Sequence, residues 1–271
     1  MADDAAAQVE QAGPTRPTGP TGSDTGVPAA SVPARVAVVW ETLQAALAER
    51  CQRSGQTSLD VLDLGGGTGG LAVPLAEAGH RVTVVDPSPD ALAALDARAA
   101  GRGSVRAVQG DADTLRAVVE PESYDVVVCH GVLERVDDVA ASLAAIAEVL
   151  RAGGLLSVVV ANRYAAVLAR TLAGQFADAR RLLTDPDGRW GLGDPLPRRF
   201  DAAGLLALLE PVGLRPHTIR GARVLADMVP GPLVDAEPGA SRSLLMLERE
   251  LAGHPAFRDV AAAVHVLASK D

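Results

Sequence analysis

The sequence contains little cysteine, few aromatic residues and almost no lysine. Among 271 residues the two cysteines, Cys51 and Cys129, stand alone, with no Cys-x-x-Cys pair and no histidine at ligand spacing. This pattern predicts a cytoplasmic protein without disulfides and without a zinc or other metal site. Aromatic residues make up 3% of the chain, so side chains for stacking nucleic-acid bases are scarce.

Long apolar runs are also missing. Stretches such as LLSVVVA at 155–161 are far shorter than the roughly 20 residues that cross a membrane. The N-terminus shows no basic segment followed by an apolar one, which argues against a secretory signal. Residues 1–30 hold few large apolar side chains, and we expect a disordered tail there, followed by one domain at 31–271.

Charge is distributed unevenly along the chain. The net charge is −9, and Lys270 is the single lysine, so arginine supplies 24 of the 25 basic residues. Residues 162–223 nevertheless contain ten arginines against six acidic residues, a local charge of +4 that leaves −13 for the remainder. The acidic total argues against a general nucleic-acid binder, whereas the basic segment is a candidate contact for an anionic acceptor.

Apolar runs alternate with helical patterns from residue 36 to residue 162. A helix is expected at 36–50, and further helices at 70–79, from Pro89 to Gly101 with Ser88 as N-cap, and from Asp137 to Gly153. The predicted strands are 59–65, 80–86, 104–111, 124–131 and 155–162. This alternation is typical of a parallel sheet covered by helices on both faces.

The pattern changes after Asn162. We expect a helix at 163–182, a loop at 184–198, a helix near 201–210, and two β-rich segments, 214–225 and 260–270, that form an antiparallel hairpin. The predicted fold is therefore α/β, with a doubly wound, mostly parallel seven-stranded sheet and a terminal antiparallel hairpin. Residues 163–200 are expected to be an inserted substrate-binding segment.

The segment VLDLGGGTGG at 61–70 leads from a strand into five glycines. Gly65, Gly67 and Gly69 lack Cβ atoms, so the backbone can approach a ligand closely and offer its N–H groups. The spacing also fits the dinucleotide fingerprint Gly-x-Gly-x-x-Gly, so a nicotinamide or flavin enzyme stays open on the glycines alone.

Acidic residues after the strands narrow the choice of ligand. Asp63 precedes the glycines by two positions, where a carboxylate can pair with an ammonium group and would repel a pyrophosphate. Asp86, at the end of the second predicted strand, is placed to bind both ribose hydroxyls of an adenosine group. In GDADTL at 110–115, Asp111 or Asp113 can reach the adenine amino group and the Ala112 amide a ring nitrogen. Together these residues favour a compact adenosyl ligand.

These motifs resemble those of the class I S-adenosylmethionine-dependent methyltransferases. The resemblance rests on VLDLGGGTGG, VTVVDPSPDAL, GDADTL, YDVVVCHGVLERVDD and LRAGGLLSVVV, which follow the family's order and spacing over about residues 59–162. It implies a Rossmann-like methyltransferase fold with S-adenosylmethionine as cofactor. The glycines would then lie against the methionine portion and the ribose of that cofactor.

More of the chain, most of residues 32–271, is similar to the bacterial tRNA 5-carboxymethoxyuridine methyltransferases. CHGVLERVDD, NRYAAVLARTLAGQFADA, LPRRFDAAGLLALLEPVGL, RGARVLADM and LLMLERELAGHPAF resemble that branch in order. The resemblance implies that the tRNA anticodon loop is the partner. It also implies cofactor contacts from Arg35, Gly65, Gly66, Asp86, Ala112 and His130. The branch's lysine-rich run is absent from the inserted segment, which weakens the assignment of an RNA acceptor.

The expected activity is methyl transfer to a carboxylate of a modified wobble uridine. An acceptor carboxylate is ionised at neutral pH and needs no general base, so orientation by arginine suffices. The candidates for positioning it are Arg163, Arg198, Arg199 and Arg223. Alternatives are a methyltransferase for a small acidic or phenolic acceptor and a protein that binds the cofactor without chemistry. A nicotinamide oxidoreductase ranks last because Asp63 is badly placed for a pyrophosphate.

Overall fold

The computed structural model describes residues 34–99, 103–235 and 238–271, without the side chains of residues 34, 35 and 235. Chain contacts separate residues 1–32 from a second unit at 33–271, and the description below concerns that second unit. The predicted tail at 1–30, the side chain of Arg35 and the expected helix end at Gly101 lie outside the described residues.

Seven strands form one sheet in the order β3-β2-β1-β4-β5-β7-β6. The first five strands pair in parallel, whereas β7 runs antiparallel to both β5 and β6. This topology confirms the predicted doubly wound sheet with its terminal antiparallel hairpin. The strands are β1 (Asp60–Leu64), β2 (Arg81–Asp86), β3 (Val105–Gln109), β4 (Tyr124–His130), β5 (Leu150–Ala161), β6 (Leu214–Ala222) and β7 (Ala263–Lys270).

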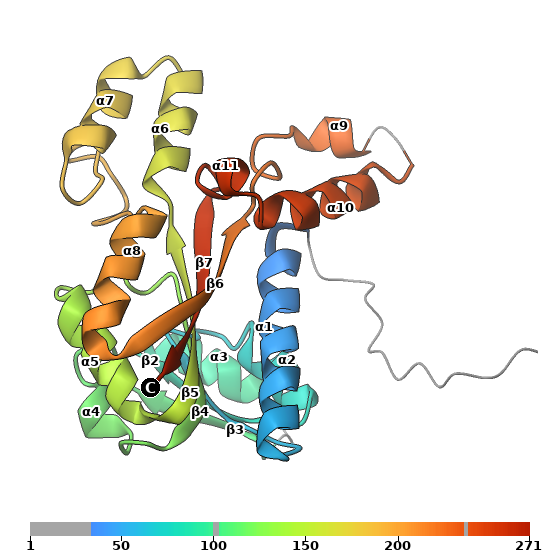
Figure 1. Cartoon of the computed structure of the whole chain (residues 1–271), viewed down its shortest axis with the longest axis vertical. Helices are drawn as coiled ribbons and strands as arrows, with labels where there is room; N and C mark the ends of the chain where they lie inside the picture. Colours follow the sequence, from blue (N-terminus) through green and yellow to red (C-terminus); the bar gives the residue numbers. More distant parts are fainter. Residues whose placement is uncertain (1–33, 100–102, 236–237) are drawn as a thin grey trace, which may run out of the picture. The chain divides into compact units, whose positions relative to one another are not determined.

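Helices cover both faces of the sheet, because neighbouring strand residues point to opposite sides. Val61 belongs to the apolar core beneath one set of helices, and Leu62 belongs to the core beneath the other set. Figure 1 shows α1 (Ala34–Ser54), α2 (Ala72–Glu77) and α3 (Pro89–Arg98) on one side. On the other side lie α4 (Leu115–Val118), α5 (Val139–Val149) and α8 (Ala202–Leu209), which is followed by the short helix η1 (Glu210–Val212).

Both ends of α5 differ from the sequence prediction. The N-cap of α5 is Asp138, whose side chain accepts a hydrogen bond from the Ala141 N–H, and not the preceding Asp137. That helix ends at Val149, and β5 begins at Leu150, before the glycines that were expected to end the helix. Strand pairing of β5 with β4 replaces the last helical turn that the apolar spacing had suggested.

The predicted single helix at 163–182 is two helices. They are α6 (Arg163–Leu172) and α7 (Phe176–Thr184), and Gly174 lies between them with φ at 73°. A left-handed residue ends a helix, because the next N–H groups turn back onto its last carbonyls. Figure 1 shows α6 and α7 next to each other beyond the end of β5.

The segment that contains these helices starts and ends at one point of the sheet edge. Asn162 and Phe200 form a parallel bridge, the Arg163 N–H donates to the Phe200 carbonyl over 2.8 Å, and the Phe200 N–H donates to the Ala161 carbonyl over 3.0 Å. Since β5 delivers the chain to this edge, the segment lies at the carboxyl ends of the parallel strands.

Three helices between β6 and β7 were not predicted. They are α9 (Gly231–Asp235), α10 (Ala240–Ala252) and α11 (Pro255–Arg258). Contacts join α10 to α1, and one of them is an ion pair from the Arg249 Nε to Glu41 at 2.9 Å.

Candidate functional site

A cavity of about 430 Å³ opens at the carboxyl ends of β1, β2, β3 and β4. In open α/β sheets this edge is where ligands bind. The sequence had placed candidate residues after each of these strands, and the structure brings several of them to one cavity. Its walls include Gly65, Asp86, Asp111, Ala112, Asp113 and His130.

The first two glycines of the turn after β1 have no room for a side chain. Gly65 has φ at 72°, and a Cβ there would lie 2.5 Å from a methyl carbon of Val132. At Gly66 a Cβ would lie 2.5 Å from the Asp63 Oδ2 atom. The Gly67 N–H donates to the Asp86 Oδ2 over 2.9 Å. Only glycine therefore lets this turn pass so close to the carboxylates and the cavity wall.

Asp63 is a buried carboxyl beneath this turn. Its side chain is 3% exposed, and its Oδ2 has no hydrogen-bond partner among the described residues. Burial, with a smaller contribution from the charge of Asp86, raises the pKa of Asp63 to about 7. A cationic ligand group nearby would stabilise the ionised form and give the oxygen a partner.

Asp86 ends β2 with both carboxylate oxygens engaged. One oxygen accepts the Gly67 N–H, and the other accepts the Ser88 N–H over 2.9 Å. Each carboxylate oxygen has a further lone pair, so Asp86 can still accept hydrogen bonds from a ligand's hydroxyl groups. The two backbone bonds fix its orientation toward the cavity before a ligand binds.

After β3, the residues predicted to lie near an adenine all line the cavity, but they differ in how far other residues already bond them. Asp111 accepts hydrogen bonds from the Thr114 hydroxyl at 2.7 Å and the Thr114 N–H at 2.9 Å. These bonds lower the pKa of Asp111, the hydroxyl first and the backbone second. Ala112 is 3% exposed, and the exposed Asp113 also lines the cavity. The capping bonds leave Asp113 as the less engaged carboxylate here.

His130 ends β4 and forms part of the cavity wall. Its Nε2 lies 2.9 Å from the Ser157 Oγ, behind the cavity. Burial, followed by the nearby His265, holds the pKa of His130 well below its usual value. The imidazole is therefore neutral at physiological pH.

Glu134, in the loop after β4, is a buried carboxyl that was not among the residues predicted for the site. It is 4% exposed, and its Oε1 accepts the Ala161 N–H over 2.6 Å. Burial is the main cause that raises its pKa. This bond ties the cavity loop to the end of β5. The signal in the sequence was its place in CHGVLERVDD, directly after a buried strand.

Three of the four candidate arginines gather around a second cavity of about 510 Å³, next to the inserted segment. Arg198 donates to the Val136 carbonyl at 3.0 Å and pairs with Asp187 at 3.2 Å. Arg163 donates to the Pro186 carbonyl at 2.6 Å. Asp137 lines both this cavity and the one at the strand ends. The inserted segment and the cavity at the strand ends are therefore neighbours.

Arg199 also lines this cavity, but its side chain is bonded to other residues of the inserted segment. It is 6% exposed and makes a two-pronged ion pair with Asp194, with bonds of 2.7 and 2.9 Å. Its guanidinium carbon also lies 4.4 Å from the centre of the Trp190 ring. Such bonding holds the loop in shape and leaves Arg199 few donors for a ligand.

Arg223 stands apart from the other three. It lines an apolar cavity of about 310 Å³ between α6 and residues 223–228, which Arg199 also borders. Its φ is 56°, a left-handed conformation for a non-glycine residue. The next three N–H groups, of Val224, Leu225 and Ala226, all donate to the buried Glu248 carboxylate of α10. Glu248 thus fixes the turn that presents Arg223.

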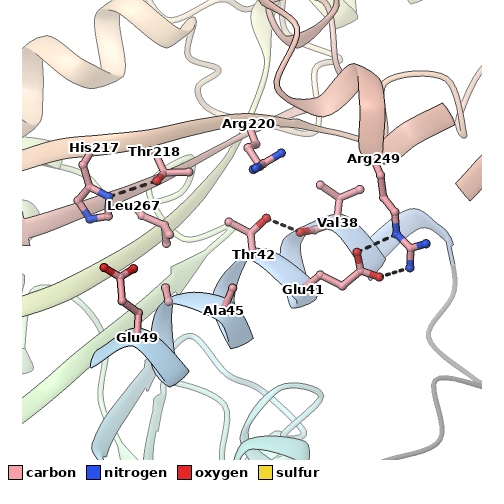
Figure 2. Close-up of a pocket in the computed structure, with 11 residues that line it drawn as sticks. Val38, Glu41, Thr42, Ala45, Glu49, His217, Thr218, Arg220, Arg249 and Leu267 are labelled. Atoms are coloured by element: carbon pink, nitrogen blue, oxygen red, sulfur yellow. Dashed lines mark hydrogen bonds and ion pairs between the residues drawn. The ribbon is translucent and has the colours of Figure 1, made fainter. Parts of the chain in front are cut away.

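Another groove, of about 410 Å³, lies between α1 and the β6–β7 pair (Figure 2). Arg249 and Glu41 close one end, and His217 and Glu49 lie at the other, while Arg220 points between them toward α1. Of the predicted site residues whose side chains the structure describes, none lines this groove.

None of the helices in residues 34–99, 103–235 and 238–271 has the length and apolar character needed to span a bilayer. In the same part of the chain, no three His, Cys, Asp or Glu side chains are grouped so as to hold a metal ion.

Known proteins are similar either to the central part of this chain or to most of it. A family model described as a methyltransferase domain matches residues 62–156. The tRNA 5-carboxymethoxyuridine methyltransferase of Escherichia coli is 28% identical over 239 residues, which are 87% of this chain and 88% of that protein. A ubiquinone biosynthesis O-methyltransferase of Xanthomonas euvesicatoria is 33% identical over 163 residues, 59% of this chain and 64% of that protein.

Solved structures share the fold. An S-adenosylmethionine-dependent methyltransferase from Mesorhizobium loti superposes with a TM-score of 0.57 at 20% identity, over 86% of this chain and 98% of that one. This likeness confirms the predicted Rossmann-like methyltransferase fold.

Proposed function

This chain is an S-adenosylmethionine-dependent methyltransferase, and on that premise we propose that it methylates the carboxylate of 5-carboxymethoxyuridine at the wobble position of tRNA. The main support is the extent of the similarity to the Escherichia coli tRNA enzyme, which runs over 239 residues. That length includes the additions to the core, whereas the Xanthomonas euvesicatoria relative matches 163 residues. The additions are where acceptors are selected on a shared fold.

The cavity at the strand ends fits the cofactor. Asp63 has a buried oxygen without a partner among the described residues, and at Gly66 the absence of a Cβ lets the turn pass directly over that carboxyl. In this proposal Asp63 faces the ammonium group, Asp86 the ribose hydroxyls, and Asp111 and Ala112 the adenine. Gly65, Gly66, Gly67 and His130 lie along the cofactor, and Arg35 binds its carboxylate. S-adenosylmethionine supplies a methyl group on a sulfonium sulfur as the electrophile.

The protein's task toward the acceptor is orientation. A carboxylate is ionised at neutral pH, so no side chain has to remove a proton, and alignment supplies most of the rate. Arg163 bonds the Pro186 carbonyl and Arg223 pairs with Asp227 at 3.1 Å, and each guanidinium has further N–H donors beyond that one bond. Both border the cavities, and we assign them to the acceptor carboxylate or its flanking phosphates. Arg198 and Arg199 are assigned to holding the segment in shape, because Arg199 pairs with Asp194 inside it and Arg198 ties it to the Val136 carbonyl.

The test is transfer of labelled methyl from S-adenosylmethionine to tRNA that carries the unesterified base, followed by mild alkali. Label on the wobble base that alkali releases is expected. Turnover on tRNA should also fall as salt rises, because phosphate contacts release counterions. Arg223→Gln should make the salt slope shallower by about 1. Arg106→Gln, an exposed arginine on the edge strand β3, is the matched control and should leave the slope unchanged.

A small acidic or phenolic acceptor is the second candidate. The cavity beside α6 favours it, since Ala165, Leu168, Ala169 and Leu172 give it a mostly apolar lining. Cofactor binding without label on tRNA, together with turnover on a small acceptor that barely changes with salt, would replace the first proposal with this one.

A further inference from the structure

Three polar side chains form a buried line across the face of the sheet that α1 covers. His130 of β4, Ser157 of β5 and His265 of β7 are linked by Ser157, whose Oγ lies 2.9 Å from the Nε2 of each histidine. Ser157 is fully buried and His265 is 1% exposed. The two imidazole rings meet edge to face with their centres 5.7 Å apart. The line begins at the cofactor cavity and ends in the core.

One hydroxyl proton has to serve both bonds. Ser157 can donate to one imidazole nitrogen only, so the other nitrogen must donate to Ser157. Both rings are neutral, because burial lowers the pKa of His130 and, with the charge of Arg220, lowers that of His265 to about 4. The line therefore has two possible directions, and each fixes the tautomers of both histidines.

The surroundings of His265 determine which of the two directions of hydrogen-bond donation is adopted. Its Nδ1 is buried without a partner among the described residues. A buried N–H without an acceptor is among the rarest defects in folded proteins, so this nitrogen carries a lone pair. Arg220 is the cross-strand neighbour of His265 and lies on the α1 side of the sheet (Figure 2). Its positive charge also favours a lone pair over an N–H group.

We propose that Ser157 and His265 are positioning residues that hold His130 as its Nδ1–H tautomer. The His265 Nε2–H donates to Ser157, and the Ser157 hydroxyl donates to the His130 Nε2. His130 then has a donor on its remaining nitrogen, which has no protein partner among the described residues. A donor in the cavity wall suits a carboxylate. Under the proposed function that carboxylate comes from the cofactor or from the acceptor.

Long-range ¹H–¹⁵N correlation spectra of the full chain read the tautomers directly. The chain has five histidines, so single His→Gln variants assign the signals. The ligand-free protein should show His130 with its proton on Nδ1 and His265 with its proton on Nε2. A proton on the His130 Nε2 would overturn the proposal, whatever the acceptor turns out to be.

Variants separate positioning from folding. Ser157→Ala and His265→Leu should each shift His130 toward its Nε2–H form, whereas His265→Gln keeps a donor toward Ser157 and should preserve the Nδ1–H form. His217→Gln, at an exposed histidine, is the control. If either loss variant does not fold, the other carries the comparison with His265→Gln.

Two affinities distinguish the source of the carboxylate. If the cofactor supplies it, Ser157→Ala should weaken S-adenosylhomocysteine binding about tenfold in calorimetry. If the acceptor supplies it, the same variant should raise the KM of the acceptor about tenfold at saturating S-adenosylmethionine. Unchanged tautomers, or unchanged values of both constants, would refute the positioning role. A failure of tRNA methylation alone would refute only the proposed function.

Discussion

Asp63 makes the stability of the protein depend on pH in a direction that can be isolated by one substitution. The pKa of its carboxyl is about 7 in the folded protein, because burial and then Asp86 disfavour the charged form, against 3.8 for an unperturbed side chain. A folded-state pKa above the unfolded value stabilises the fold at low pH. That contribution is lost as pH rises from about 4 to about 7.

Asp63→Asn removes this dependence while keeping the shape of the side chain. A shift of about three pKa units corresponds to about 4 kcal/mol at 1.36 kcal/mol per unit. The free energy of unfolding of the variant minus that of the wild type should therefore rise by about 4 kcal/mol between pH 4 and pH 8. Most of the rise should be complete by about pH 7, and above that the difference should be level.

Urea unfolding followed by tryptophan fluorescence, at half-unit steps of pH, measures this difference. Asp96→Asn, an exposed carboxyl on α3, is the control and should give a level difference. Under the proposed function the same Asp63 variant should bind S-adenosylhomocysteine more weakly, since it loses the carboxylate assigned to the ammonium group. A difference in the free energy of unfolding that stays constant within about 0.5 kcal/mol from pH 4 to pH 8 would refute the raised pKa of the buried Asp63 carboxyl.

Two further predictions concern the additions to the core. Glu248→Gln replaces one of two buried oxygens that together accept three N–H groups. It should lower the free energy of unfolding by about 1–3 kcal/mol in urea titrations, whereas the exposed Glu250→Gln on the same helix should change it little. Asp194→Ala strands the buried Arg199 charge and should lower that free energy by about 3–5 kcal/mol. Asp187→Ala, whose pair with Arg198 is half exposed, should lower it by less than about 1 kcal/mol. A larger loss of stability for Glu250→Gln than for Glu248→Gln, or for Asp187→Ala than for Asp194→Ala, would contradict these roles.

The core could be predicted because its signals are local. Asp86 is the last residue of an apolar strand, which can be recognised in the sequence. Parallel strands bring their carboxyl ends to one edge of the sheet, so residues at those ends lie close together although they are far apart in sequence. The glycine turn gave a similar local signal at Gly65. For the same reason the seven-strand topology was predictable from the spacing of apolar runs.

Side-chain pairings between elements could not be predicted in this way. Glu248 reaches residues 224–226 across more than 20 positions of the chain, and no periodicity marks it among the charged residues of α10. Ser157 stands in the apolar run LLSVVVA, where its hydroxyl gave no sign of two histidine partners. The break at Gly174 was missed because apolar positions continue at helical spacing on both sides of it.

The closed ends of the inserted segment have an evolutionary consequence. Residues 163–199 leave the sheet at Asn162 and return beside it at Phe200, held there by backbone hydrogen bonds that any sequence can form. The segment can therefore be lengthened, shortened or exchanged for another without disturbing strand order or the glycine turn after β1. Under the proposed function, new acceptors can then arise by replacing this one segment while the sheet and its helices stay the same.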